Sequence, residues 1–252
     1  MTLAFNEAGK GTAVVLLHGF PLDSTIWMQQ KQQLSQRFRV ITPDLRGHGR
    51  NPAPEGVYEM SSMARDVVDL LDSLDIKKAV IMGHSMGGYV ALAAWNIAPE
   101  RFLGLGLIAS QAGADSEEGR QGRYKTAEKV AAEGSKVIAD AMIPKLFAPD
   151  ADVAIVESVR QLILKTAPAG IIGTLKGMAV RADSTSVLPT INVPVLILAG
   201  EKDAIIPPTK AEAMASALPS ATLVMVANAG HMPMLEQPEA TTTAMSKFLA
   251  AF

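Results

Sequence analysis

The chain contains no cysteine, and this absence removes several classes of chemistry at once. Without cysteine there is no disulfide, no thiolate nucleophile and no zinc site built on Cys ligands. Histidine is also scarce, with only 4 in 252 residues, so any reaction that uses an imidazole has few candidates. The sequence shows neither an H-E-x-x-H pattern nor clustered His and Asp residues. We therefore expect no metal and no cofactor.

A strong charge of either sign is missing as well. Lys and Arg number 23 and Asp and Glu 25, which gives a formal net charge of −2. This balance provides no general basic field for nucleic acid, so we expect no nucleic-acid partner. No apolar run approaches the roughly 18 residues of a membrane span, and the first residues do not resemble a signal peptide. The expectation is a cytoplasmic protein with no membrane partner.

The residues that are present indicate a globular α/β protein. Apolar residues make up 48% of the chain and charged residues 19%, a composition that excludes disorder. Several short runs are almost continuously apolar, as in strands buried on both faces of a parallel sheet. Helical patterns lie between most of these runs, and this alternation predicts an α/β fold with a largely parallel sheet. The strand-like runs are 13–17, 39–42, 79–82, 103–108, 193–199 and 222–226.

Residues 111–189 interrupt this alternation. The stretch contains no convincing strand, and its helix-like segments are rich in Ala, Glu and Lys and are separated by Gly and Pro. We interpret it as a helical cap, or lid, inserted between two core strands. The predicted organisation is a core domain of residues 1–110 and 190–252 with the cap 111–189 between them.

One motif carries a candidate nucleophile. Residues 83–88 read Gly-His-Ser-Met-Gly-Gly, which matches G-x-S-x-G. The motif follows the predicted strand 79–82 and precedes an apolar helix at 88–97. A nucleophilic serine on a sharp strand-to-helix turn requires this context, and the helix N-terminus below it favours negative charge. The alternative interpretation is a glycine-rich turn in which Ser85 only caps the helix.

A serine nucleophile needs a base, because its hydroxyl is weakly nucleophilic at its own pKa. The candidates are His18, His48, His84 and His231. The side chain of His84 is expected to point away from its neighbour Ser85. His231 follows the last predicted strand, at the sheet edge where open α/β sheets bind their ligands. We therefore predict that His231 is the base.

The base in turn needs an acid that orients it. Asp203 follows the apolar strand 193–199 and is expected at the same edge of the sheet as His231. Glu201 is the rival, although we interpret it as an exposed turn residue. The transition state also needs backbone donors for the developing oxyanion, and the N–H groups of Phe20 and Met86 are the candidates.

Together these motifs resemble the α/β-hydrolase superfamily over essentially the whole chain, and most of all its small esterase, enol-lactonase and cofactor-free haloperoxidase or perhydrolase group. The resemblance implies a mostly parallel sheet of seven or eight strands, flanked by helices and carrying a cap. It implies Ser85 as nucleophile, Asp203 as acid, His231 as base, and the Phe20 and Met86 amides as oxyanion-hole donors. The matching segments are 18–21, 44–49, 83–88, 200–203 and 230–231.

The predicted function is a serine esterase that cleaves small carboxylic esters or lactones through an acyl-enzyme. Alternatives on the same scaffold are a C–C bond hydrolase, a perhydrolase, or a non-catalytic receptor for small molecules. The expected partner is a small-molecule substrate, and no oligomeric state is predicted. The candidate lining of the substrate pocket is Met142, Leu146, Phe147 and Met232.

Overall fold

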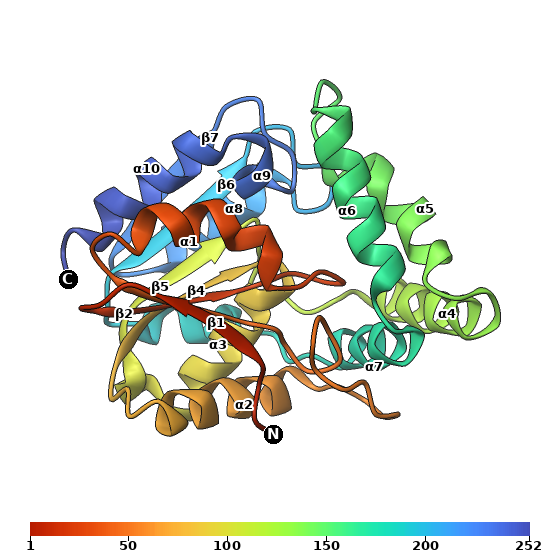
Figure 1. Cartoon of the computed structure of the whole chain (residues 1–252), viewed down its shortest axis with the longest axis horizontal. Helices are drawn as coiled ribbons and strands as arrows, with labels where there is room; N and C mark the ends of the chain where they lie inside the picture. Colours follow the sequence, from red (N-terminus) through yellow and green to blue (C-terminus); the bar gives the residue numbers. More distant parts are fainter.

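A computed structural model describes all residues of the chain, 1–252, and is built on a seven-stranded sheet (Figure 1). The strand order is β1-β3-β2-β4-β5-β6-β7, in which only β1 is antiparallel to its neighbour. The predicted α/β fold with a mostly parallel sheet of seven or eight strands is thus confirmed, with seven. The strands are β1 (Phe5–Ala8), β2 (Ala13–Leu17), β3 (Arg39–Pro43), β4 (Ala79–His84), β5 (Phe102–Ile108), β6 (Val195–Gly200) and β7 (Ala221–Val226).

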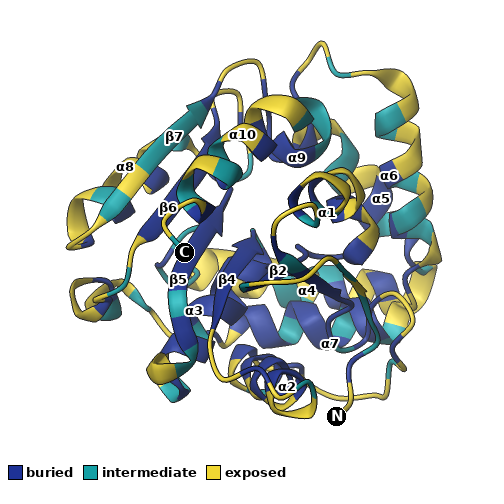
Figure 2. Ribbon diagram, turned by 60° about the vertical axis from the view of Figure 1, so that its left-hand side comes forward, coloured by how far each residue is buried: buried dark blue, intermediate teal, exposed yellow.

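Burial explains why the central strands lack an alternating pattern. Every residue of β2, β4 and β6 is buried, whereas most residues of the edge strands β1 and β7 are only partly buried. Helices cover both faces of the sheet, so the side chains on both faces of a central strand are buried and apolar residues need not alternate with polar ones. Figure 2 shows this burial concentrated on the central strands, with exposed residues along outer helices such as α6 (Val153–Lys165).

Helices pack against both faces of the sheet. α1 lies beside α10 on one face and α2 beside α3 on the other (Figures 1 and 2). The apolar residues Met63, Val67, Leu70 and Leu71 of α2 are buried, and they recur at the spacing of one helix face. These helices are α1 (Met28–Leu34), α2 (Met60–Ser73), α3 (Met86–Ile97), α8 (Pro208–Ala217), α9 (Pro233–Glu236) and α10 (Pro238–Leu249), with 3₁₀ turns at Ser24–Trp27 and Pro99–Arg101.

Four helices and a 3₁₀ turn, but no strand, lie between β5 and β6. In Figure 1 α4, α5 and α6 form a group at one side of the sheet, and α4 packs closely on α7. The division of the chain into a core and a separate cap domain stays a prediction. The inserted elements are α4 (Glu117–Glu133), α5 (Lys136–Leu146), α6 (Val153–Lys165), α7 (Pro168–Ala179) and the turn Thr185–Thr190.

None of the helices combines the length and the apolar content that crossing a bilayer would need.

Candidate active site

Ser85 occupies a strained turn between the end of β4 and the start of α3. Its φ of 49° and ψ of −114° lie in a region that side-chain-bearing residues rarely adopt, at a typical cost of about 1–3 kcal/mol. The Ser85 side chain makes no capping hydrogen bond to α3. Ser85 is also the only residue of the stretch 81–90 that is not buried. Ser85 is therefore partly accessible at this turn, and capping of α3 does not account for its side chain.

Glycines around Ser85 allow the strand and the helix to approach closely. A Cβ at Gly83 would lie 2.1 Å from the carbonyl carbon of Gly87, and one at Gly88 would lie 2.3 Å from the Ser110 Oγ. Side chains cannot occupy these positions unless the backbone shifts. The Ser110 hydroxyl in turn donates to the Ser85 carbonyl at 2.8 Å. The turn is thus held by contacts with both β4 and the end of β5.

His231 and Asp203 form a buried pair at the same edge of the sheet. His231 follows β7 and Asp203 follows β6, and the distance from His231 Nδ1 to Asp203 Oδ2 is 2.8 Å. Asp203 Oδ1 accepts the N–H groups of Ile205 and Ile206, each at 2.8 Å. Because a carboxylate can only accept, the imidazole donates from Nδ1 and leaves Nε2 as a lone pair. This is the tautomer that a general base needs.

His84 connects the turn at Ser85 to residues 227–232, the loop between β7 and α9 that carries His231 and is called the histidine loop below. Its Nε2 donates to the carbonyl of His231 at 2.8 Å, and the two rings lie 4.9 Å apart. Burial lowers the pKa of His84 well below its usual value, so the ring stays neutral. A Cβ on Gly19 would lie 2.4 Å from His84 Nδ1 and 3.2 Å from Ser85 Cβ. The loop after β2 therefore packs directly against both residues.

The other two histidines are buried and bonded to backbone groups. His18 Nδ1 donates to the Gly19 carbonyl at 2.9 Å, and its Nε2 accepts a backbone N–H at 2.8 Å. His48 donates from Nδ1 to the Arg46 carbonyl at 2.9 Å. Burial lowers the pKa of His18 to about 4 and that of His48 to about 3. Of the four histidines, only His231 is hydrogen-bonded to a carboxylate.

The predicted oxyanion donors lie at two backbone positions beside Ser85. Met86 is the first residue of α3 and is fully buried. Phe20 follows Gly19, and the Phe20–Pro21 peptide bond is cis. The Phe20 N–H donates to no group within the protein, so it is free to bind a ligand oxygen. The roles of both amides in catalysis stay predictions.

The predicted pocket residues divide into two groups. Leu146 and Phe147 lie at the end of α5 against the histidine loop, where the Leu146 carbonyl accepts the N–H of His231 at 2.9 Å. Met232 is fully buried next to His231, whereas Met142 is only partly buried on α5. Contact of these side chains with a substrate stays a prediction.

Glu236 on α9 is a residue that the sequence analysis missed. Its carboxylate accepts the N–H groups of Gly230 and Met232, on either side of His231, and that of Ala148. The only sequence signal was an acidic residue shortly after His231, which does not reveal a contact 88 positions away in the chain.

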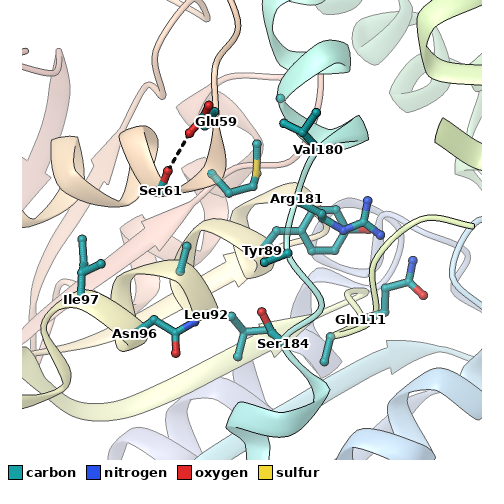
Figure 3. A pocket seen from close by; sticks show the side chains of 15 residues that line it. Glu59, Ser61, Tyr89, Leu92, Asn96, Ile97, Gln111, Val180, Arg181 and Ser184 are labelled. Carbon is teal, nitrogen blue, oxygen red and sulfur yellow. Dashed lines mark hydrogen bonds between the residues drawn. The ribbon is translucent and has the colours of Figure 1, made fainter. Parts of the chain in front are cut away.

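A pocket of about 360 Å³ opens elsewhere, between α2, α3 and the end of α7 (Figure 3). The Arg181 guanidinium stacks on the Tyr89 ring at 4.4 Å and is paired with Asp115 at 2.7 Å. None of the predicted site residues lines this pocket. The structure also contains no group of three or more His, Asp or Glu residues that could hold a metal ion.

Comparisons with known proteins identify the family and the fold of the chain. A family model described as the alpha/beta hydrolase family matches residues 14–244. A thermophilic esterase from Thermogutta terrifontis, solved with malate bound, has a TM-score of 0.97 and 43% identity, over 99% of this chain and 93% of that one. An enol-lactonase from Burkholderia xenovorans LB400 has a TM-score of 0.92 and 29% identity, over 98% and 96%.

A third relative is longer than this chain. It is the dihydrolipoyllysine-residue acetyltransferase component of an acetoin cleaving system from Pseudomonas putida, 34% identical over 97% of this chain. The match spans only 65% of that protein's length.

Proposed function

The chain belongs to the alpha/beta hydrolase family, and we propose that it is a serine hydrolase acting on small carboxylic esters or lactones. The observation that carries this proposal is the buried His231–Asp203 pair at 2.8 Å, at the sheet edge where the strained turn presents Ser85. A carboxylate that fixes the tautomer of an imidazole, together with a presented serine, is the arrangement that nucleophilic acyl transfer requires.

In the proposed reaction Ser85 Oγ attacks the substrate carbonyl carbon, and His231 Nε2 takes the serine proton. The resulting imidazolium is stabilised by Asp203, which accepts a hydrogen bond from Nδ1–H while the proton stays on the ring. Collapse of the tetrahedral intermediate breaks the bond to the alcohol oxygen, which receives the proton from Nε2. Water then attacks the acyl-enzyme by the same route, which releases the acid and restores Ser85. A lactone follows the same steps and gives a hydroxy acid.

The oxyanion of each tetrahedral intermediate is proposed to bind the Phe20 and Met86 N–H groups. Support comes from the Phe20 N–H, which has no partner within the protein, and from the close approach of its loop to Ser85. Such donors typically contribute about 10²–10³ in rate each.

The substrate class is supported by the relatives. The named activities of the two structural neighbours, an esterase and an enol-lactonase, both cleave a bond between an acyl carbon and oxygen. Helices inserted between β5 and β6 reach the histidine loop through Leu146, so the acyl or alcohol group is expected to meet an enclosed surface. We therefore favour small substrates over polymers.

The test is steady-state hydrolysis of p-nitrophenyl esters from acetate to dodecanoate and of a small lactone. Ser85→Ala is expected to lower kcat by about 10⁴ or more, the scale seen when a triad member is removed. Ser216→Ala, an exposed serine on α8, is the matched control and should keep wild-type kinetics. Equal activity in wild type and Ser85→Ala on every ester and lactone would contradict the proposal.

A further inference from the structure

The Glu236 carboxylate binds backbone on both sides of the candidate base. Oε1 accepts the N–H of Gly230 at 2.9 Å and that of Met232 at 3.1 Å. Oε2 accepts the N–H of Ala148 at 2.7 Å and is 3.0 Å from the Gly230 nitrogen. One half-buried carboxylate on α9 therefore holds three N–H groups from two segments far apart in the chain.

These bonds leave His231 little freedom of movement. The N–H groups of residues 230 and 232 are both held by Glu236, and the N–H of His231 itself donates to the Leu146 carbonyl at 2.9 Å. Three consecutive peptide groups are thereby fixed. The position of an imidazole depends on the backbone that carries it, and a misplacement of about 1 Å in an active site can cost about 10²-fold in rate.

The same carboxylate joins the histidine loop to the inserted helices. Ala148 belongs to the segment after α5, and this segment lies so close that a Cβ on Gly230 would be 2.6 Å from the Ala148 nitrogen. The Glu236 carboxylate therefore binds both Ala148 and the backbone beside His231. A displacement of α5 would be transmitted to the histidine loop through this carboxylate.

We propose that Glu236 is a positioning residue that sets the place of His231 and couples it to the inserted helices. The role rests on the proposed function, because positioning matters for rate only if His231 is the base. The carboxylate matters for this role, because it offers acceptors on both oxygens. An amide in its place keeps one acceptor and turns a donor toward a remaining N–H.

The variants Glu236→Gln and Glu236→Ala separate the two parts of the proposal. The glutamine can keep its oxygen toward Gly230 and Met232, but its NH₂ group then faces the Ala148 N–H and that bond is lost. The alanine loses all of the bonds. We expect kcat to fall about 10-fold in Glu236→Gln and about 100-fold in Glu236→Ala, with KM nearly unchanged. Glu239→Gln, an exposed glutamate three residues further on, should keep wild-type kcat.

Two measurements distinguish positioning from a general loss of structure. The thermal midpoint reports folding, and the proton resonance of the His231 Nδ1–H reports its bond to Asp203 independently of turnover. A kcat loss in the folded Glu236→Gln protein with a shifted Nδ1–H resonance supports the proposal. Wild-type kcat in Glu236→Gln, or a loss explained entirely by the unfolded fraction, would overturn it.

The NMR readout also separates this proposal from the proposed function. If the wild type shows no Ser85-dependent hydrolysis, the proposed function fails, while the Nδ1–H resonance in Glu236→Gln still decides whether Glu236 positions His231. An unchanged resonance would overturn the positioning role whatever the activity of the wild type.

Discussion

Replacing Asp203 by Asn should abolish most activity while leaving the fold intact. The Ile205 and Ile206 N–H groups both point at Asp203 Oδ1, so they hold the oxygen of an asparagine amide in that place. Its NH₂ group then faces His231 Nδ1 and forces the ring proton onto Nε2. An imidazole in that tautomer cannot accept the Ser85 proton.

The size of the effect follows from the distance between the two charges. At 2.8 Å between His231 Nδ1 and Asp203 Oδ2, with an effective dielectric constant of about 20, the Coulomb attraction between the carboxylate and an imidazolium is about 6 kcal/mol. Since about 1.4 kcal/mol corresponds to tenfold in rate, the expected loss is about 10⁴ in kcat. The loss of the correct tautomer has a similar size in a serine protease triad.

The assay is kcat and kcat/KM on the best p-nitrophenyl ester, with the thermal midpoint of each variant. Glu201→Gln is the matched control, because Glu201 is the rival acid in the same loop and its side chain is exposed. It should keep wild-type kcat. More than a tenth of wild-type kcat in Asp203→Asn, or an equal loss in Glu201→Gln, would show that Asp203 does not orient the base.

Two further predictions concern pH and the loop after β2. The pKa of His18 falls to about 4 and that of His48 to about 3 on burial, so the unfolded chain binds more protons below pH 6.5. The contribution of these neutral histidines to the free energy of unfolding is therefore complete above that pH and is lost as the pH falls toward 4, by roughly 3 kcal/mol for His18 alone. Urea unfolding at pH 7 and at pH 5 measures this loss. Equal free energies of unfolding at the two pH values would contradict it. Gly19→Ala would place a Cβ 2.4 Å from a buried imidazole nitrogen, so the loop must shift and kcat should fall about 10²-fold. Ester kinetics beside a thermal melt test this, and a folded Gly19→Ala protein with wild-type kcat would show that the loop has no such role.

The parallel core of the fold could be predicted because its signals are local. Runs such as 13–17 and 79–82 are continuously apolar, and the structure buries every residue of β2 and β4. The segment between the predicted strands 13–17 and 39–42 shows the limit of such signals. The chain forms a 3₁₀ turn at Ser24–Trp27, in which Trp27 is fully buried, before α1 begins at Met28.

The candidate site residues that directly follow a strand could be predicted from the sequence. Ser85, Asp203 and His231 follow β4, β6 and β7, and parallel strands bring their carboxyl ends to one edge. The contacts between side chains and distant backbone were not predictable in the same way. His84 donates to a carbonyl 147 positions away and Glu236 binds an amide 88 positions away, and no spacing in the sequence encodes either contact.

The most direct test of the central claim is covalent labelling of the wild-type protein with a fluorophosphonate, followed by peptide mass spectrometry. One equivalent of reagent is expected to react at Ser85, with parallel loss of ester hydrolysis. His231→Ala is expected to react far more slowly, because Oγ then lacks its base. Labelling at another residue, or full hydrolysis after Ser85 is modified, would contradict the claim that Ser85 is the nucleophile.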